Sequence, residues 1–330
     1  MSDSSFRQEP VLFGADQTLM GVITCPAIGV DASGPVACLM LNMGANHRGG
    51  PHRINVKLAH RLASLGMTSL RMDLAGLGDS GPASSAERYL IQGIRDLQAG
   101  MDLIEAKFGI RRFVVVGLCS GTAHAMGLAV ADTRIAGILM FDGYSFPSRR
   151  WYWERTFWRA LAAPTNPAVI GKTIRWMRRK MLNIATTPPV DIFRVDEESP
   201  EEIQAIFKNS MNEITQRGVS VYLLYSGTQH VRDRSRDHLG PLVREPFAAK
   251  VKYEFARDID HTFTSIAAQQ AFMVRASAWA LGIAAEFTVP LSTGAASEPI
   301  SLAAFNQRRA TAQVAQVAPI AQRPVGAAAN

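Results

Sequence analysis

Cysteine is scarce in this sequence, and the few cysteines present match no metal-binding or redox motif. Only Cys25, Cys38 and Cys119 occur in 330 residues. They are odd in number, far apart, and outside any Cys-x-x-Cys or mixed Cys/His spacing typical of zinc sites. We therefore expect reduced thiols and no bound metal.

Long apolar stretches, internal repeats and a secretory leader are also missing. No run approaches the roughly 18 apolar residues that a membrane span requires, and no fixed period recurs. The first residues, MSDSSFRQEP, lack a basic head followed by an apolar stretch. These absences predict a cytoplasmic protein without a transmembrane segment, and no pattern among them specifies an oligomeric state.

Positive charge is in excess, with a net charge of +7, and much of the excess falls in residues 149–180. Arginines and lysines alternate there with tryptophans and other aromatic residues. Such a segment could bind an anionic carbohydrate, a coenzyme A-like phosphate or, peripherally, a membrane surface. We prefer an amphipathic helix with a basic solvent face. No recognised nucleic-acid motif accompanies the charge, so no nucleic-acid partner is expected.

Apolar runs alternate with segments of helical periodicity along most of the chain. Strands are predicted at residues 36–41, 68–74, 113–116, 135–141, 219–225 and 250–255. Helices are predicted at residues 54–65, 94–108, 120–131 and 265–281. The alternation favours an α/β fold with a mostly parallel sheet and right-handed crossovers.

The alternation is interrupted once and ends before the chain does. It stops at Asp142 and resumes near residue 219. We therefore predict a core at residues 1–142 and 218–284, with a helical cap inserted at residues 143–217. Residues 285–330 are rich in Ala, Gln, Pro, Val and Ser without hydrophobic periodicity, which predicts a disordered tail.

The segment FVVVGLCSG carries the strongest chemical signal. It reads as a buried strand followed by Gly-x-Cys-x-Gly and a helix, the pattern of a nucleophile elbow. The strained central residue needs small residues two positions before and after it. Gly117 and Gly121 frame Cys119 in this way, whereas Ser120 would be framed by Leu118 and Thr122. Cys119 is therefore the predicted nucleophile.

Other expected parts of an α/β hydrolase follow in the right order. The loop that starts at Asn42 follows the first strong strand, where an oxyanion-hole amide belongs. His261, in DHTFTS, follows the last predicted strand. We predict His261 as the base and the amides of Ala45 and Ser120 as oxyanion donors.

Four segments carry a resemblance to a known family. LNMGANHRGG, DLAGLGDSG, GLCSG and DHTFT resemble the serine-aminopeptidase-like α/β hydrolases, in particular those of bacterial exopolysaccharide and exosortase gene clusters. The likeness spans residues 36–281 and is weakest in the predicted cap. It implies an α/β-hydrolase fold and hydrolysis of an ester, thioester or amide through a covalent acyl-enzyme. The Gly-x-Cys-x-Gly pattern also resembles dienelactone hydrolases and polyhydroxyalkanoate synthases.

The catalytic acid is where the sequence departs from that family. Family members usually carry a carboxylate just after the strand predicted at residues 219–225, but here the chain continues Ser-Gly-Thr-Gln-His. Asp233 is the nearest replacement and is ranked first. Asp237 and Asp142, the latter after the preceding strand, remain alternatives.

These patterns predict an acyl hydrolase that acts on a small-molecule ester or thioester. An acyltransferase of the same fold, with a carbohydrate or other alcohol as acceptor, is the alternative, and a degenerate hydrolase used for binding is a third. The run GLGDSG at residues 76–81 matches the dinucleotide-binding pattern, but another strand precedes its unit and a proline delays the helix. No cofactor is expected.

Overall fold

An eight-stranded sheet runs through the molecule in the order β1-β2-β4-β3-β5-β6-β7-β8. The structure is a computed structural model that describes residues 6–27, 34–83, 87–147, 153, 171, 199–228 and 236–288. The strands are β1 (Phe6–Phe13), β2 (Leu19–Pro26), β3 (Ala37–Met40), β4 (Ser69–Met72), β5 (Phe113–Leu118), β6 (Ile135–Phe141), β7 (Ser220–Ser226) and β8 (Lys252–Ala256).

The strand directions define the fold. Strands β3 to β8 pair in parallel, whereas β2 runs antiparallel to both β1 and β4. A mostly parallel sheet in this order, with helices on both faces, is the α/β-hydrolase fold. The fold class predicted from the sequence is confirmed.

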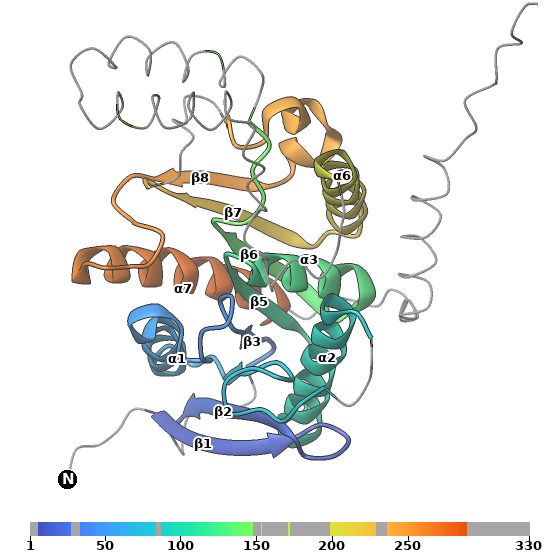
Figure 1. Ribbon diagram of the computed structural model, residues 1–330. Helices are drawn as coiled ribbons and strands as arrows, with labels where there is room; N and C mark the ends of the chain where they lie inside the picture. The colour runs from blue at the N-terminus through green and yellow to red at the C-terminus, as the bar shows by residue number, and fades with distance from the viewer. Residues whose placement is uncertain are drawn as a thin grey trace, which may run out of the picture.

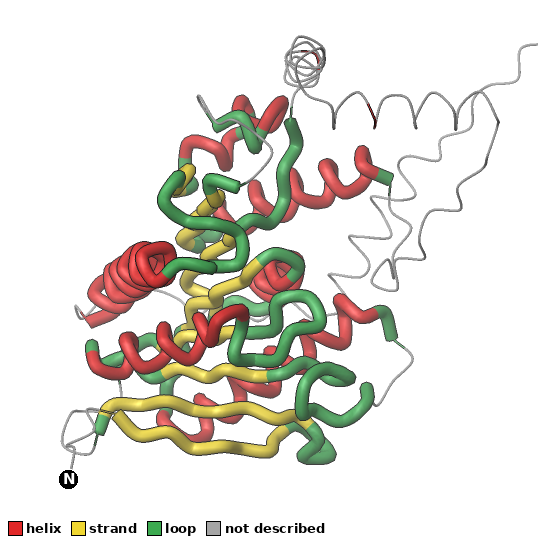
Figure 2. The backbone as a smooth tube through the Cα atoms, turned by 60° about the vertical axis from the view of Figure 1, so that its left-hand side comes forward, coloured by secondary structure: helices red, strands yellow, loops and turns green. Residues whose placement is uncertain are grey.

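Helices cover both faces of the sheet, as the two views show (Figure 1 and Figure 2). Helices α1 (Ile54–Ser64) and α7 (Ile266–Thr288) lie on one face. Helices α2 (Tyr89–Phe108), α3 (Gly121–Ala131) and α6 (Pro200–Gln216) lie on the other. Successive side chains of a strand point to opposite faces, so Phe113 and Val115 enter one buried cluster and Val114 and Val116 the other.

The parallel part of the sheet winds in opposite directions from β3. The chain moves from β3 to β4 on one side, whereas β5 pairs with β3 on the other. At such a switch point the loops that leave the carboxyl ends of the two strands diverge and leave a crevice between them. The loop after β3 and the turn after β5 therefore meet at the edge where ligands bind in this class of fold.

Helix α6 lies within the range predicted for the cap, residues 143–217. Ser199 and Glu202 form a capping box at its start, and its buried residues Phe207, Met211 and Ile214 join the core that also holds residues of α3. Of the basic segment at residues 149–180, only Trp153 and Gly171 are among the described residues. The predicted basic cap face therefore lies outside them.

The two ends of the described chain differ from the expectation in detail. The hairpin of β1 and β2 at the start was not predicted. Helix α7 continues to Thr288, so the first residues of the stretch 285–330 are helical. The reason is packing, because Phe287 contacts the core and its ring lies 5.7 Å from the Arg112 guanidinium. Residues 289–330 lie outside the described residues.

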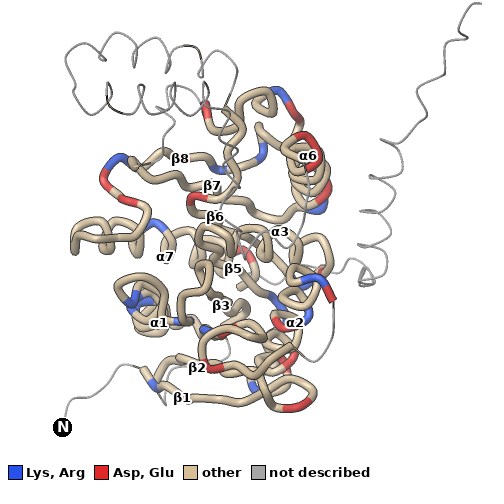
Figure 3. Tube along the Cα trace, in the orientation of Figure 1, with Lys and Arg blue, Asp and Glu red and all other residues tan. Residues whose placement is uncertain are grey.

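Charges of both signs are interspersed over the described part of the chain rather than separated onto two faces (Figure 3). Among the described helices, none combines the length and the apolar character that a bilayer crossing demands.

Candidate active site

Cys119 lies in the turn between β5 and α3, at the carboxyl end of the sheet. Its φ of 52° is in the left-handed region, which a non-glycine residue seldom adopts. Its amide donates to the Phe141 carbonyl at 2.8 Å, and its own carbonyl accepts from the Thr122 amide at 3.1 Å. The turn is thus tied to β6 and to the first turn of α3, and this holds the strained residue in place.

The two glycines that frame Cys119 are required by close approaches. A Cβ on Gly117 would lie 2.7 Å from the Gly121 carbonyl oxygen, and a Cβ on Gly121 would lie 2.9 Å from the Asn42 carbonyl oxygen. Real Cβ atoms do not approach main-chain oxygens so closely. The spacing seen in the sequence therefore has a steric cause, and the second approach brings the turn against the loop after β3.

That loop also meets the turn through Ser120. The Gly44 amide donates to Ser120 Oγ at 2.7 Å, and the Asn46 amide closes a turn onto the Met43 carbonyl at 3.0 Å. Ala45 is the oxyanion donor predicted from the sequence for this loop. The hydrogen bond to Ser120 is made by Gly44, the residue before Ala45.

The base of the same loop is held by a buried polar network. Asn42 Nδ2 donates to the Asn46 carbonyl at 2.8 Å and to Asp73 Oδ1 at 2.7 Å. Asn42 Oδ1 accepts from the Leu74 amide at 2.8 Å, and Asp73 Oδ1 also accepts from the Arg48 amide at 2.6 Å. The loops after β3 and β4 are thereby fixed to each other.

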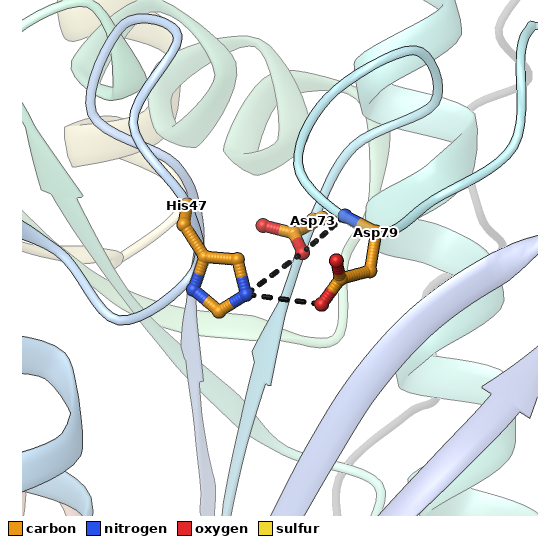
Figure 4. A group of neighbouring side chains, drawn as sticks. All are labelled: His47, Asp73 and Asp79. Carbon is orange, nitrogen blue, oxygen red and sulfur yellow. Dashed lines mark hydrogen bonds and ion pairs between the residues drawn. The ribbon is translucent and has the colours of Figure 1, made fainter.

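His47, Asp73 and Asp79 bring three potential metal ligands together at this junction (Figure 4). Their ligand atoms lie within 4.8 Å of one another. However, Arg48 Nη1 lies 2.5 Å from Asp73 Oδ2 and 2.7 Å from Asp79 Oδ2, so its guanidinium already occupies the space between the two carboxylates. Hydrogen bonds from Arg48 and His47 lower the pKa of Asp79. A cation would have to displace Arg48, and we therefore interpret the cluster as an ion-pair link between loops.

This link explains Gly78, the second glycine of the run at residues 76–81. A Cβ on Gly78 would lie 2.3 Å from the Asp73 carboxyl carbon, and Gly78 has a φ of 52°. The glycine makes room for a buried side chain of the protein, which accounts for it without a dinucleotide.

His261 lies in the loop between β8 and α7. Its amide donates to Thr228 Oγ1 at 2.9 Å, and Asp260 beside it accepts from the Thr262 and Thr264 amides. Phe263, with a φ of 58°, is fully buried and stacks on Phe141 at 4.7 Å between ring centroids. The loop is therefore fixed on both sides of the histidine.

Among the described residues, the carboxylate that contacts His261 is Asp142. Asp142 Oδ2 lies 2.8 Å from His261 Nδ1, and Asp142 Oδ1 accepts from the Ser226 amide at 2.7 Å. Asp142 directly follows β6 and its side chain is completely buried. Its φ of 49° is again left-handed, a conformation that aspartate tolerates better than most residues.

Both Asp142 and Cys119 act on the ring of His261. Hydrogen bonding to Asp142 and then to Cys119 raises the pKa of His261 to about 10. The negative charge of Asp142 raises this pKa further, whereas partial burial of the ring lowers it. The imidazole is therefore protonated at neutral pH. Since Nδ1 contacts Asp142, Nε2 is the ring nitrogen left for the thiol.

Of the site residues predicted from the sequence, the nucleophile, the base and the two oxyanion segments come together. Cys119, Ser120, the loop around Ala45 and His261 meet at one edge of the sheet. Asp233 lies outside the described residues. Asp142 was an alternative in the sequence, and its signal was its position immediately after an apolar strand. The contacts of Ser226 and Thr228 were not foreseen, because neither residue type is diagnostic.

A cavity of about 780 Å³ lies next to the segment that begins three residues after Asp142. Ser145, Phe146 and Pro147, which follow Asp142 along the chain, form one wall, and the start of α6 and residues 240–244 form the others. The lining is largely apolar, with Arg244 as a cationic group. A pocket of this size can hold a small organic ligand.

Asp73→Asn should lower the free energy of unfolding by about 3 kcal/mol, because it weakens a buried ion pair and leaves Arg48 partly uncompensated. Urea unfolding followed by circular dichroism measures the change. Asp16→Asn, an exposed aspartate in the β1–β2 turn, is the control and should be silent. Equal stability of the two variants would contradict the link.

The His261 contacts predict how stability depends on pH. The unfolded chain has an ordinary histidine pKa of about 6.5, whereas the folded pKa is raised to about 10. The stabilisation is therefore complete below about pH 6.5 and is lost as pH rises toward the folded value. The urea midpoint should fall more steeply across this window in the wild type than in His261→Gln. Parallel slopes would show that His261 is not held as an imidazolium.

No model of a protein family and no curated protein matches this sequence. Among solved structures, the chain is similar to the esterase PF2001 of Pyrococcus furiosus, at 13% identity and a TM-score of 0.49, over 83% of this chain and 89% of that one. It is similar to a cold-adapted esterase from an Arctic intertidal metagenomic library, at 14% identity and a TM-score of 0.46, over 83% and 93%. It is also similar to XC6422 of Xanthomonas campestris, an α/β serine hydrolase without lid, at 12% identity and a TM-score of 0.46, over 89% of this chain and 99% of that one. The strand order described above, and not these similarities, defines the fold.

Proposed function

We propose that this protein is an acyl hydrolase with Cys119 as nucleophile. His261 is the general acid and base, and Asp142 is the carboxylate that orients His261. The observation that carries the proposal is the hydrogen bond between His261 and Asp142, with Cys119 as the second side chain that raises the pKa of the same ring. Nucleophile, base and orienting group in hydrogen-bond contact are the signature of covalent catalysis.

In the reactive form the Cys119 proton lies on His261, which leaves a thiolate beside an imidazolium. The thiolate of Cys119 attacks the acyl carbon of an ester or thioester, and the carbonyl electrons move onto oxygen. When the intermediate collapses, the bond to the leaving group breaks and His261 gives its proton to the departing oxygen or sulfur. The products of this half-reaction are an acyl-Cys119 enzyme and a free alcohol or thiol.

Water completes the cycle. Neutral His261 takes a proton from a water molecule, and the resulting hydroxide attacks the acyl carbon. Collapse of the second intermediate breaks the carbon–sulfur bond, releases the acid and returns the thiolate beside imidazolium. Asp142 supports both steps because it holds the ring in one tautomer and stabilises its charge.

The oxyanion of each intermediate needs preformed donors. The Ser120 amide at the start of α3 and the amide of Ala45 in the loop after β3 are the candidates. The Gly44 to Ser120 contact supports this assignment, because it holds the two segments side by side. The apolar cavity that starts three residues after Asp142 is our candidate for the site of the acyl group.

Cys119→Ala should abolish both ester hydrolysis and labelling by iodoacetamide without loss of the fold, because the nucleophile is gone. Ser120→Ala keeps the main-chain amide and loses only the hydroxyl that accepts from Gly44, so it should retain about a tenth of the activity or more. Deletion of an oxyanion donor would instead lower the activity by about a hundredfold or more. Hydrolysis of p-nitrophenyl esters measures both, with the buried Cys25→Ala as control. Loss in Ser120→Ala alone would overturn the assignment of the nucleophile.

Asp142→Asn should lower turnover by roughly two to four orders of magnitude, because the amide cannot stabilise the imidazolium and favours the wrong tautomer. Asp237→Asn and Asp233→Asn should remain near wild type. The comparison is made on kcat with thermal unfolding as a check on folding. A large loss in Asp233→Asn with an active Asp142→Asn would return the acid to the position ranked first from the sequence.

A further inference from the structure

The end of β7 is where the family that this sequence resembles carries its acid, and this chain has Ser226, Gly227 and Thr228 there. None of the three can supply a carboxylate. All three nevertheless make contacts to the loops that carry Asp142 and His261.

The first contact is to the acid. The Ser226 amide donates to Asp142 Oδ1 at 2.7 Å, which leaves Oδ2 for His261. This bond uses the main chain, so it fixes the carboxylate regardless of the side chain at residue 226.

The second contact is to the base, and it does depend on a side chain. Thr228 Oγ1 accepts from the His261 amide at 2.9 Å and lies 3.0 Å from Ser226 Oγ. A hydroxyl can accept one hydrogen bond and donate another, so both interactions can exist together. One hydroxyl therefore connects the main chain of His261 to the residue whose amide holds Asp142.

A tight approach between main chains fixes the same region. The Gly227 amide donates to the Ile259 carbonyl at 2.8 Å, and a Cβ on Gly227 would lie 2.6 Å from the Arg257 carbonyl oxygen. The turn after β7 and the loop before His261 are in direct contact. Thr228 then adds a side-chain hydrogen bond to the histidine itself.

We infer that Thr228 is a positioning residue, whose hydroxyl holds the main chain of His261 where the imidazole reaches Asp142 with Nδ1 and Cys119 with Nε2. The inference rests on the function proposed above. A ring that must satisfy two partners at once tolerates displacement of only about 0.5 Å. Without the hydroxyl, the loop gains freedom and the ring aligns with both partners for a smaller fraction of the time.

The test compares Thr228→Val, which removes the hydroxyl at nearly constant shape, with Thr228→Ser, which keeps it. Thr288→Val is the matched control, because Thr288 Oγ1 only donates to carbonyls of α7. Three quantities are measured: the rate of Cys119 alkylation by iodoacetamide at about pH 7, kcat and KM, and the titration of the His261 ring by NMR.

Thr228→Val should slow alkylation and lower kcat by roughly tenfold, the scale expected for modest misplacement of a catalytic group, with KM nearly unchanged. The His261 titration should move to lower pH, because its contact with Asp142 is weakened. Thr228→Ser should restore most of each value, and Thr288→Val should match the wild type. Ser226→Ala removes the hydroxyl that contacts Thr228 but keeps the amide that contacts Asp142. It should change the alkylation rate, kcat and the histidine titration in the same direction by less. This variant serves as the test if Thr228→Val does not fold.

Unchanged alkylation and an unchanged histidine titration in folded Thr228→Val would overturn the inference. A lower melting temperature with both values unchanged would also overturn it, since that is a purely structural role. Failure of the proposed function has a different signature. Wild-type Cys119 would then react no faster than an ordinary thiol, while the His261 titration would still report whether Thr228 holds the ring.

Discussion

The hydrogen bond between Asp142 and His261 joins residues that are 119 positions apart in sequence, and the geometry of the site depends on it. One end is a buried carboxylate on β6, and the other is a histidine that is about a third exposed on the loop before α7. A buried carboxylate is costly to keep unless it is paired, so the aspartate and the imidazolium stabilise each other. The same pairing turns the second ring nitrogen toward the thiol.

Several backbone positions at the site are strained, and the rest of the fold compensates for them. Among the described residues, Cys119, Asp142 and Phe263 all have φ between 49° and 58°. Non-glycine residues in this region cost of order 1–3 kcal/mol each and persist only where the surroundings determine them. Here the surroundings are hydrogen bonds between strand ends and the stacking of Phe263 on Phe141. Two large apolar clusters on either side of the sheet stabilise the fold that holds these residues.

Local patterns in the sequence were sufficient for the parallel part of the sheet. Strand β6 has the predicted bounds of residues 135–141, and β3 to β5, β7 and β8 agree within a few residues, because buried parallel strands are short continuous apolar runs. The β1–β2 hairpin was missed, since β1 is an edge strand with mixed burial and contains Pro10. Cys119 and His261 could be proposed from the sequence, because glycine spacing and the order of elements along the chain can be read without the structure. Asp142 was not ranked first, because the choice among carboxylates depends on which strand ends face His261, and that is a tertiary relation.

The position of Asp142 also changes which strands share the site. Leu118 and Phe141 are paired neighbours in β5 and β6, and the Cys119 amide bonds to the Phe141 carbonyl. The proposed nucleophile and the proposed acid therefore follow adjacent hydrogen-bonded strands in the middle of the sheet, and His261 comes from the loop after β8 at the edge. The sulfur and the carboxylate are thus linked through one pair of strands, whereas the histidine is held by a separate loop. Variation at the β8 edge, whether by sequence drift or by a molecule that binds there, can tune reactivity without moving the sulfur relative to the carboxylate.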